Sequence, residues 1–281
     1  MRVITLTTDF GHSEYVAQMK GVILGIAPDV RIVDISHDIS PQCVIEGAFV
    51  LMSSVPHFKD AVHVAVVDPG VGSERAALVF QCRTGILVGP DNGLLAPAAE
   101  MLGLEGCFRI EDKAAKFIDE HHEISHTFHG RDIFAPVAAR LAQGEIEPSD
   151  VGCAVDRYIK LDIMGSKTTD KGTSGTILRV DRFGNILTNI KPSAINAGLH
   201  EKFDVIIGKK KFAARFVRTY SDADTDELIV LKSSAGLLEL SINGASAAEK
   251  INSKPGQKVC IERSFSVSKM GRRPGLSRKK N

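Results

Sequence analysis

Two charged residues, Asp68 and Arg75, flank a turn rich in glycine, and they are the most informative chemical groups in this sequence. The turn follows an apolar, strand-like run that begins at Val64, and Asp9 and Asp91 also follow apolar runs. Functional side chains of α/β proteins tend to lie on loops of this kind, at the ends of strands. We therefore expect the three carboxylates to meet in one crevice. A carboxylate there can accept a proton, and a guanidinium can stabilise negative charge.

A group of histidines supplies the second set of candidate residues, within and just before the segment HEISHTFHG. A metal site is one interpretation, with the ligands His121, His122, His126, His129 and Asp132. The segment has no clear helical pattern and no second acidic cluster beside it, so we expect no metal here. Each candidate also has an ordinary structural interpretation: Asp68 could shape its turn, Arg75 could be a solvated surface cation, and His129 could be a hydrogen-bonded core residue.

The elements that must position these residues alternate between strand and helix in the first half of the chain. This order predicts an α/β domain with a mainly parallel sheet over residues 1–165. Pro136 must lie near the first turn of its helix or kink the helix, because proline lacks the backbone N–H that a helix interior needs. We expect strands at Arg2–Leu6, Arg31–Ile35, Ala61–Val67, Ala77–Phe80 and Ile86–Val88, and helices at Glu14–Ile26, Val44–Ser54, Leu94–Leu102 and Asp132–Gln143.

The pattern changes after the polar segment between Gly165 and Gly175, which we interpret as a linker or exposed turn. Short β-like runs such as TILRV, FDVII and ELIVLK follow it, separated by turn residues. They predict a smaller, all-β, barrel-like domain with antiparallel strands over residues 172–266. Residues 267–281 are basic and lack apolar periodicity, so we expect a disordered tail.

Composition narrows the classes of partner. The chain has 281 residues, with 35 lysines and arginines against 34 acidic residues, so no broad electrostatic field favours nucleic acid or a membrane. A small-molecule ligand is the expected partner. The sequence shows no signal-peptide pattern and no long apolar run, which predicts a cytoplasmic protein. The five cysteines form no CxxC pair, so neither a zinc site nor a disulfide framework is indicated.

A series of short strings, in order along nearly the whole chain before the tail, resembles the S-adenosylmethionine hydroxide adenosyltransferases, which are relatives of fluorinase and chlorinase. The strings are TTDFG (Thr7 to Gly11), DISHDISP (Asp34 to Pro41), VVDPGVGSER (Val66 to Arg75), GPDNGLL (Gly89 to Leu95), TFHGRDIFAP (Thr127 to Pro136) and VDRFGNILTNI (Val180 to Ile190). The resemblance implies hydrolysis of S-adenosyl-L-methionine to adenosine and L-methionine by in-line attack of water or hydroxide on the ribose C5'. It implies no metal and no cofactor, and it makes the (R)-sulfonium epimer a candidate substrate. It also implies a homotrimer, with the substrate between the α/β domain of one chain and the β domain of its neighbour.

The resemblance assigns Asp68, Arg75 and His129 to a trio that holds the attacking water. In that interpretation Asp68 or His129 accepts the proton, and Arg75 orients its partners and stabilises charge on the oxygen. The leaving group is a neutral thioether and needs no acid. Transfer of a proton from water to a histidine with an ordinary pKa, which would form free hydroxide, costs roughly 12 kcal/mol of free energy. Proton removal must therefore accompany the attack, or the site must hold the anion.

The same resemblance assigns residues to the substrate. Asp9 matches the carboxylate that faces the ribose hydroxyls, because two acceptor oxygens suit a vicinal diol. Asp181 matches the partner of the methionine ammonium group, and Asn185 can pair its amide with the adenine edge. Phe128 and Phe183 match positions whose rings pack in the pocket.

The segment SSAGLLELSING resembles a second adenosine-binding strand. It places Ser234 near the methionine carboxylate or the ribose, Glu239 nearby, and the Ile242 backbone at adenine. The halogenating relatives carry an arginine after the serine, where this chain has Ala235, so we expect a different recognition of the carboxylate. They also have a tyrosine at the position of His129, which disfavours halogenation.

Two other functional classes are open from the sequence. The chain could be a module that binds adenosine or S-adenosylmethionine with little turnover. It could also be a metal-dependent hydrolase of another nucleoside. Retention of ligand without product would indicate the first, and sensitivity to chelators the second.

Overall fold

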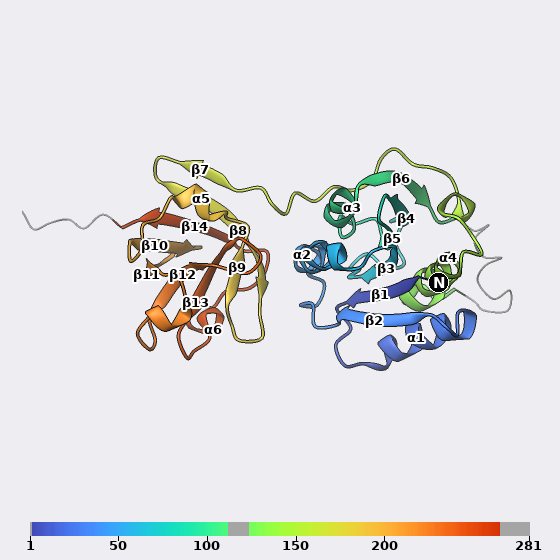
Figure 1. The fold of residues 1–281 in the computed structure, drawn as a ribbon, viewed down its shortest axis with the longest axis horizontal. Coiled ribbons are helices and arrows are strands. Elements are labelled where there is room, and N and C mark those ends of the chain that lie inside the picture. Colours follow the sequence, from blue (N-terminus) through green and yellow to red (C-terminus); the bar gives the residue numbers. More distant parts are fainter. Residues whose placement is uncertain (1, 112–123, 265–281) are drawn as a thin grey trace, which may run out of the picture.

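The computed structural model describes residues 2–111 and 124–264, which form two parts built on two separate sheets. Strands β1 to β6 form a six-stranded sheet, and β7 to β14 form an eight-stranded sheet. Figure 1 shows the two parts side by side, with helix α2 of the first facing the second. The predicted basic tail over residues 267–281 lies outside the described residues.

The first sheet has the strand order β2-β1-β3-β5-β4-β6. The neighbours β2, β1, β3 and β5 run parallel, whereas β4 pairs antiparallel with β5 and β6, so the prediction of a mainly parallel sheet is confirmed. The parallel strands end together at one edge, and their following loops meet there. The strands are β1 (Val3–Thr8), β2 (Arg31–Ser36), β3 (Ala61–Val66), β4 (Ala77–Cys82), β5 (Gly85–Pro90) and β6 (Leu104–Arg109).

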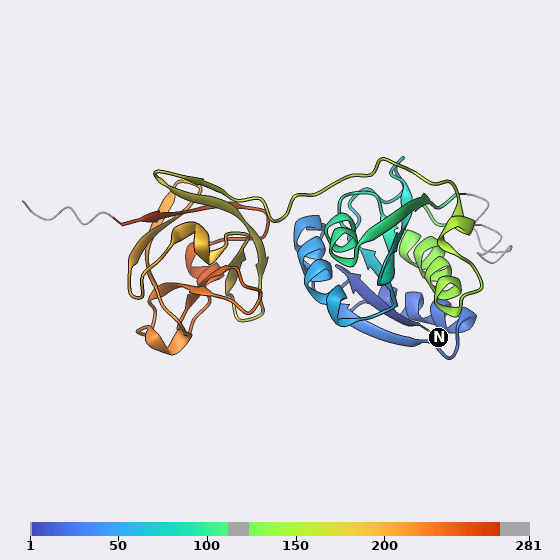
Figure 2. The ribbon, with the colours of Figure 1, turned by 45° about the horizontal axis from the view of Figure 1, so that its top comes forward.

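Helices cover both faces of this sheet (Figures 1 and 2). Helices α1 and α4 pack on one face and share a core with β1 and β3, whereas α2 and α3 pack on the other. The helix predicted at Asp132–Gln143 divides into a π-helical turn and α4, whose first turn contains Pro136 as expected. The elements are α1 (Glu14–Ile26), α2 (Val44–Ser54), η1 (Val55–His57), α3 (Ala96–Leu102), η3 (Gly130–Phe134), α4 (Ala135–Gln143) and η4 (Pro148–Val151).

The second sheet closes into a barrel because β14 pairs with β8 as well as with β10. Its interior is packed with aliphatic side chains from nearly every strand, so the barrel-like prediction is confirmed. The elements are β7 (Lys167–Thr169), β8 (Gly172–Val180), β9 (Ile186–Thr188), α5 (Pro192–Ile195), β10 (Lys202–Ile207), β11 (Lys210–Phe216), η5 (Tyr220–Asp222), β12 (Leu228–Lys232), β13 (Leu238–Ile242), α6 (Ala247–Ile251) and β14 (Lys258–Arg263).

One local expectation for this region is half right, and another is wrong. The polar segment between Gly165 and Gly175 is the start of a β-hairpin of β7 and β8 with an exposed turn, as one of the two interpretations predicted, and it is not a linker. All residues of β7 are exposed, so the strand needs no apolar side chains and gives no apolar signal. Strands β11 and β12 pair in parallel, although the other pairs of the barrel are antiparallel, because the long connection that contains η5 separates them.

The two parts touch through α2. Leu178 of β8 and Leu237, just before β13, are buried in the same apolar cluster as Phe49 and Leu51 of α2. No helix in the described part of the chain is long and apolar enough to cross a membrane.

Candidate functional site

The loop after β3 brings Asp68 and Arg75 together. Arg75 donates from Nε to Oδ2 of Asp68 at 2.9 Å and lies 2.6 Å from the same oxygen through Nη2. The backbone N–H of Gly70 donates to Oδ1 of Asp68 at 3.3 Å. Only 5% of the Asp68 side chain and 9% of the Arg75 side chain are exposed. Two nitrogens of the guanidinium therefore contact this nearly buried carboxylate, and charge-assisted hydrogen bonds of this kind are stronger than neutral ones.

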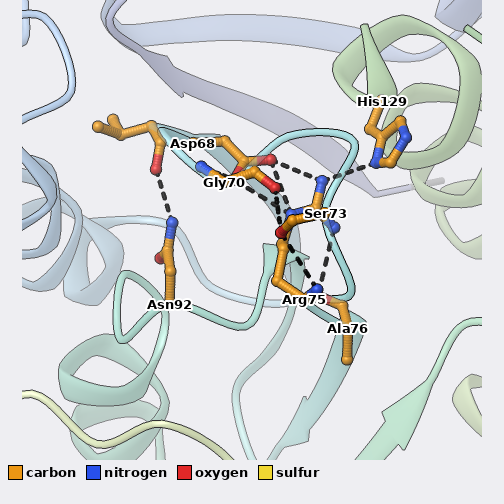
Figure 3. Close-up of polar contacts among 8 residues, drawn as sticks. Asp68, Gly70, Ser73, Arg75, Ala76, Asn92 and His129 are labelled. Carbon is orange, nitrogen blue, oxygen red and sulfur yellow. Dashed lines mark hydrogen bonds and ion pairs between the residues drawn. The ribbon is translucent and has the colours of Figure 1, made fainter. Parts of the chain in front are cut away.

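His129 completes the trio from a distant part of the chain. It immediately precedes η3, and its Nδ1 lies 2.7 Å from Nη2 of Arg75 (Figure 3). Arginine has only donors, so Nδ1 must accept this hydrogen bond and cannot carry a proton. The neutral imidazole therefore has its proton on Nε2. The structure brings together all three residues that the sequence assigned to water activation.

The surroundings of His129 favour this neutral form. Burial lowers the pKa of the imidazole below its usual value of 6.5, and the positive charge of Arg75 lowers it further. The negative charges of Asp68 and Asp132 act in the opposite direction but do not cancel this effect. At neutral pH His129 thus presents an N–H donor.

Gly72 lets the loop of Asp68 approach the segment that carries His129. Its φ is +77°, a backbone conformation that favours glycine, and a Cβ built on it would collide with the backbone oxygen of His126. Asn92 supports the loop from the other side by donating to the carbonyl of Val67 at 2.8 Å. The close contact between two segments distant in sequence therefore depends on a missing side chain.

Asp68 and His129 line a cavity of about 320 Å³ at the ends of the parallel strands, which we call the strand-end cavity, and Arg75 joins these two residues without lining it. Asp9 also lines it, and Oδ2 of Asp9 accepts a hydrogen bond from the backbone of Gln42 at 2.8 Å. Burial raises the pKa of Asp9 above its usual value, and the charge of Asp68 adds to the shift. The residues on the walls are Asp9, Phe10, Tyr15, Pro41, Gln42, Val66, Asp68, Val71, Thr127, Phe128, His129 and Gly130.

Aromatic rings form one wall of this cavity. Phe128, predicted to pack in the pocket, lies 5.7 Å from Phe10 and 5.0 Å from Tyr15 between ring centroids, in edge-to-face arrangements. The sequence analysis did not identify Phe10 and Tyr15. Tyr15 gives no distinct signal there, because it lies on a helix as an ordinary surface residue would.

A second network supports the loop of Asp9. His37 lies 2.8 Å through Nδ1 from the hydroxyl of Thr8, and 3.1 Å through Nε2 from Oδ1 of Asp34. Lys20 lies 2.6 Å from the other oxygen of Asp34. The carbonyl of His37 also accepts a hydrogen bond from the backbone of Gly11 at 2.8 Å. This network fixes both sides of the turn that carries Asp9.

Asp91 does not join the other two carboxylates. Its Oδ1 instead accepts a hydrogen bond from the backbone of Ile159 at 2.8 Å, in the segment that leads to the barrel. The expectation of three acids in one crevice is therefore wrong for Asp91, because this carboxylate satisfies a backbone donor on a neighbouring loop.

The remaining predicted residues lie on the barrel. Asp181 and Asn185 occupy the turn between β8 and β9, where Oδ1 of Asp181 accepts from the backbones of Phe183 and Asn185, at 2.9 Å each. The amide of Asn185 donates to Oδ2 of Asp181 at 2.9 Å. This bond fixes the amide orientation and leaves Asn185 one N–H and its oxygen for an adenine edge. The ring of Phe183 is 80% exposed.

Glu239 is buried in β13, and its Oε1 accepts hydrogen bonds from Tyr220 at 2.7 Å and from Ser241 at 2.8 Å. Burial and the contact with Glu239 raise the pKa of Tyr220 to about 12, so this residue keeps its proton. The sequence analysis missed Tyr220, which lies in a connection without a repeating pattern. Glu239 therefore positions Tyr220 through Oε1, and its other carboxylate oxygen, Oε2, takes no part in these hydrogen bonds.

Two cavities border these barrel residues. The barrel cavity, of about 600 Å³, is lined by Asp181, Phe183, Asn185, Tyr220, Ile242, Asn243, Gly244, Ala245 and Ser246. The interdomain cavity, of about 520 Å³, is lined by Phe49, Ser53, His57, Arg179, Asp181, Asn185, Leu187, Ser233, Ser234, Ala235 and Glu239. Asp181 and Asn185 belong to both. Neither cavity contains a residue of the strand-end cavity, so within one chain the predicted site residues form two groups.

The metal interpretation finds no support among the described residues, where no three histidine, cysteine or acidic side chains gather as metal ligands would. His121 and His122 lie outside the described residues. Asp132 instead accepts from Nε of Arg131 at 2.6 Å and from the backbone of Ser125 at 2.9 Å. This carboxylate ties together the two ends of the segment that carries His129.

Comparisons with known proteins agree with the geometry. Residues 4–152 match the family model described as the SAM hydroxide adenosyltransferase N-terminal domain, and residues 175–260 match the corresponding C-terminal domain. An (R)-S-adenosyl-L-methionine hydrolase of Methanocaldococcus jannaschii is 38% identical over 261 residues, covering 89% of this chain and 92% of the relative. A fluorinase of Actinoplanes sp. is 27% identical, covering 92% of this chain and 97% of that enzyme.

A solved structure shares the fold. The crystal structure of an uncharacterized conserved protein from Thermotoga maritima superposes with a TM-score of 0.82 at 35% identity, covering 93% of this chain and 100% of that chain. The likeness therefore extends over both sheets.

Proposed function

This chain belongs to the SAM hydroxide adenosyltransferase family, and from that premise we propose that it hydrolyses S-adenosyl-L-methionine to adenosine and L-methionine. The observation that carries the proposal is the joined trio of Asp68, Arg75 and His129, of which Asp68 and His129 line a cavity that also contains Asp9. Water attacks the ribose C5' and displaces the neutral thioether of methionine. The names of the relatives support the (R)-sulfonium epimer as substrate.

The hydrogen bonds divide the roles within the trio. The Nδ1 lone pair of His129 accepts from Arg75, and Nε2 already carries the proton of the neutral ring. His129 therefore donates a hydrogen bond to the water oxygen. Asp68 has carboxylate lone pairs beyond those that Arg75 and Gly70 occupy, so it accepts the proton as the C–O bond forms.

Arg75 holds both partners in place. Its guanidinium bridges Asp68 and His129, so the acceptor and the donor for one water molecule are fixed before substrate arrives. Fixed dipoles of this kind stabilise developing charge without reorganisation during the reaction. General-base assistance typically supplies 10²- to 10⁴-fold, so positioning and exclusion of bulk water supply much of the remainder.

The charge of Asp9 disfavours a halide as nucleophile. Asp9 lines the strand-end cavity and pairs with no cation in the described structure, whereas Asp68 is paired with Arg75, so an anion approaching C5' would meet the negative charge of Asp9. A neutral water molecule meets no such repulsion. Hydrolysis therefore fits this cavity better than halogenation.

We assign the adenosine and methionine portions to different places. Asp9 faces the ribose hydroxyls in the strand-end cavity, beside Phe128. Phe183, Asn185 and the Ile242 backbone hold adenine in the barrel cavity. Asp181, Ser234 and Glu239 border the interdomain cavity on the methionine side. Because the ribose lies between adenine and the sulfonium, the two groups must come together around one substrate.

The separation of the two groups within one chain supports a homotrimer in which the strand-end cavity of one chain faces the barrel of its neighbour. Mixing two inactive variants tests this arrangement. Chains with Asp68→Ala are mixed in equal amounts with chains with Asn185→Ala, and the subunits are allowed to exchange at random. About a quarter of the sites in the closed ring should then regain activity, because each of these combines an intact α/β domain from one variant with an intact barrel from the other. A site built within one chain would stay inactive in the mixture, and sedimentation velocity would report the oligomeric state.

The reaction is tested with ¹⁸O-labelled water and each sulfonium epimer separately. We expect adenosine and methionine in equal amounts, without added metal and unaffected by chelators, with the label in the 5'-hydroxyl. An unlabelled 5'-hydroxyl would reject water as the nucleophile. Stoichiometric retention of ligand without product would indicate a binding module instead, and loss of activity with a chelator would indicate a metal-dependent hydrolase.

A further inference from the structure

Arg179 of β8 is a half-buried cation without a partner among the residues that the structure describes. Within the described residues its guanidinium makes no hydrogen bond, ion pair or ring contact. The other described arginines that are at least half-buried each have a carboxylate oxygen within 2.7 Å: Arg75, Arg131, Arg140 and Arg215. Partly removing a charge from water costs free energy unless a partner compensates. The isolation of Arg179 therefore points to a partner outside the folded chain.

The surroundings of Arg179 indicate the kind of partner. Arg179 lines the interdomain cavity together with Ser233 and Ser234. The hydroxyl of Ser233 is shielded from solvent and has no hydrogen-bond partner. A cation beside hydroxyl donors suits an anion with several acceptor oxygens, and a guanidinium fits a carboxylate with two parallel hydrogen bonds.

An opposite charge borders the same cavity. Asp181 also lines it, but its oxygens accept hydrogen bonds from Phe183 and Asn185, and no ion pair joins it to Arg179 in the described structure. Glu239 is a second acid on this cavity, and its Oε1 accepts hydrogen bonds from Tyr220 and Ser241. Arg179 and Asp181, a cation and an anion that are not paired with each other, match the two charges of an α-amino acid. Ala235, at the turn between β12 and β13, offers no cation of its own.

Building on the proposed function, we propose that Arg179 binds the α-carboxylate of the methionine portion of the substrate. Asp181 binds the ammonium group, and Ser233 and Ser234 donate to the carboxylate oxygens. Arg179 then sets specificity for a substrate that keeps its carboxylate, and it takes no part in the attack at C5'.

Decarboxylated S-adenosylmethionine provides the decisive comparison, because it keeps the sulfonium and the amine but lacks the carboxylate. Arg179→Gln should lower kcat/KM for S-adenosylmethionine by at least about 30-fold, as loss of one partner of a buried charge pair does. It should leave kcat/KM for the decarboxylated substrate within about twofold. Arg179→Lys keeps the charge but loses the planar fork, so its kcat/KM for S-adenosylmethionine should lie between those of the wild type and of Arg179→Gln.

Arg182→Gln is the matched control. Arg182 lies in the next turn, is exposed, and borders none of the cavities described above. Its replacement should therefore leave kcat/KM unchanged for both substrates. Equal losses on both substrates in Arg179→Gln would show a structural role, such as a contact with a neighbouring chain, and would overturn the proposal. Unchanged kinetics on both would overturn it as well.

Binding without turnover separates this proposal from the hydrolase activity. Calorimetry with saturating adenosine should show that Arg179→Gln weakens the binding of L-methionine but not the binding of L-methioninamide, which has no carboxylate. Equal affinity of wild type and variant for L-methionine would contradict the role of Arg179. Failure of the wild type to hydrolyse S-adenosylmethionine would contradict the proposed function, and this calorimetric comparison would still test the carboxylate site.

Discussion

The strand-end cavity and the barrel face differ in how their charges are satisfied. In the first, Asp68, Arg75 and His129 form one joined set, in which the side chains of Asp68 and Arg75 are nearly buried. On the barrel, Arg179 has no partner in the described structure, and the Phe183 ring is 80% exposed. One region is complete before substrate binds, and the other presents groups that a ligand or a neighbouring chain must cover.

This difference follows from what each region does. A water molecule is small and weakly acidic, so the groups that orient and deprotonate it must already be in place. The nucleoside and amino-acid portions of the substrate are large and carry their own charges, so they can complete the binding face themselves. Each of the following experiments alters one side of this comparison.

Loss of Arg75 should have the largest effect. Arg75→Ala should reduce kcat by about 10²- to 10³-fold, because it removes the group that holds Asp68 and His129 together. Adenosine release measured by chromatography gives the rate, and circular dichroism checks the fold. Arg83→Ala, which removes an exposed arginine from the same domain, is the control. Turnover that stays at the wild-type level in Arg75→Ala would dismiss the trio.

Gly72→Ala should have the next largest effect. The new Cβ would collide with the backbone of His126 at a positive φ, so Arg75 and His129 would separate. We expect a stability loss of about 1–3 kcal/mol from the strained backbone and a lower kcat. Gly70→Ala is the matched control, because its Cβ would have no contact closer than 3.4 Å. Equal kinetics in both variants would show that the close approach is not required.

Phe183→Ala tests the barrel side. We expect about a tenfold higher KM for S-adenosylmethionine, because a base stacked on an aromatic ring is worth about 1–3 kcal/mol. The kcat and the melting temperature should change little, since the ring is exposed in the free chain. Leu199→Ala removes another exposed apolar side chain and should be silent. A KM equal to that of the wild type would remove Phe183 from the site.

A change of pH near neutrality should have the smallest effect on activity of these four tests. The lowered pKa of His129 means that its neutral form persists below pH 6.5, and activity should fall only as pH passes through that lowered pKa. The unfolded chain takes up this proton first, so the same window costs stability as pH falls. Nitrogen NMR of the imidazole should show the pKa rising in Arg75→Met. A pKa of His129 above 6.5 in the wild type would contradict the assigned tautomer.

Local patterns made much of the fold predictable. The apolar runs before Asp9 and Asp68 are strands of the first sheet, and the helix predicted at Val44–Ser54 has those bounds. Strand β7 escaped prediction because an exposed edge strand needs no apolar side chains. The place of Asp91 could not be read from its own loop, because the backbone donor it satisfies lies 68 residues away, at Ile159.

The sequence by itself determined the two classes of architecture and the residue types at the strand ends, because periodicity and turn composition depend on neighbours along the chain. Only the tertiary structure decided the tautomer of His129, which follows from a contact with Arg75 across 54 residues. It also decided that Arg179 has no partner among the described residues, because the presence of a partner depends on which surfaces packing brings together.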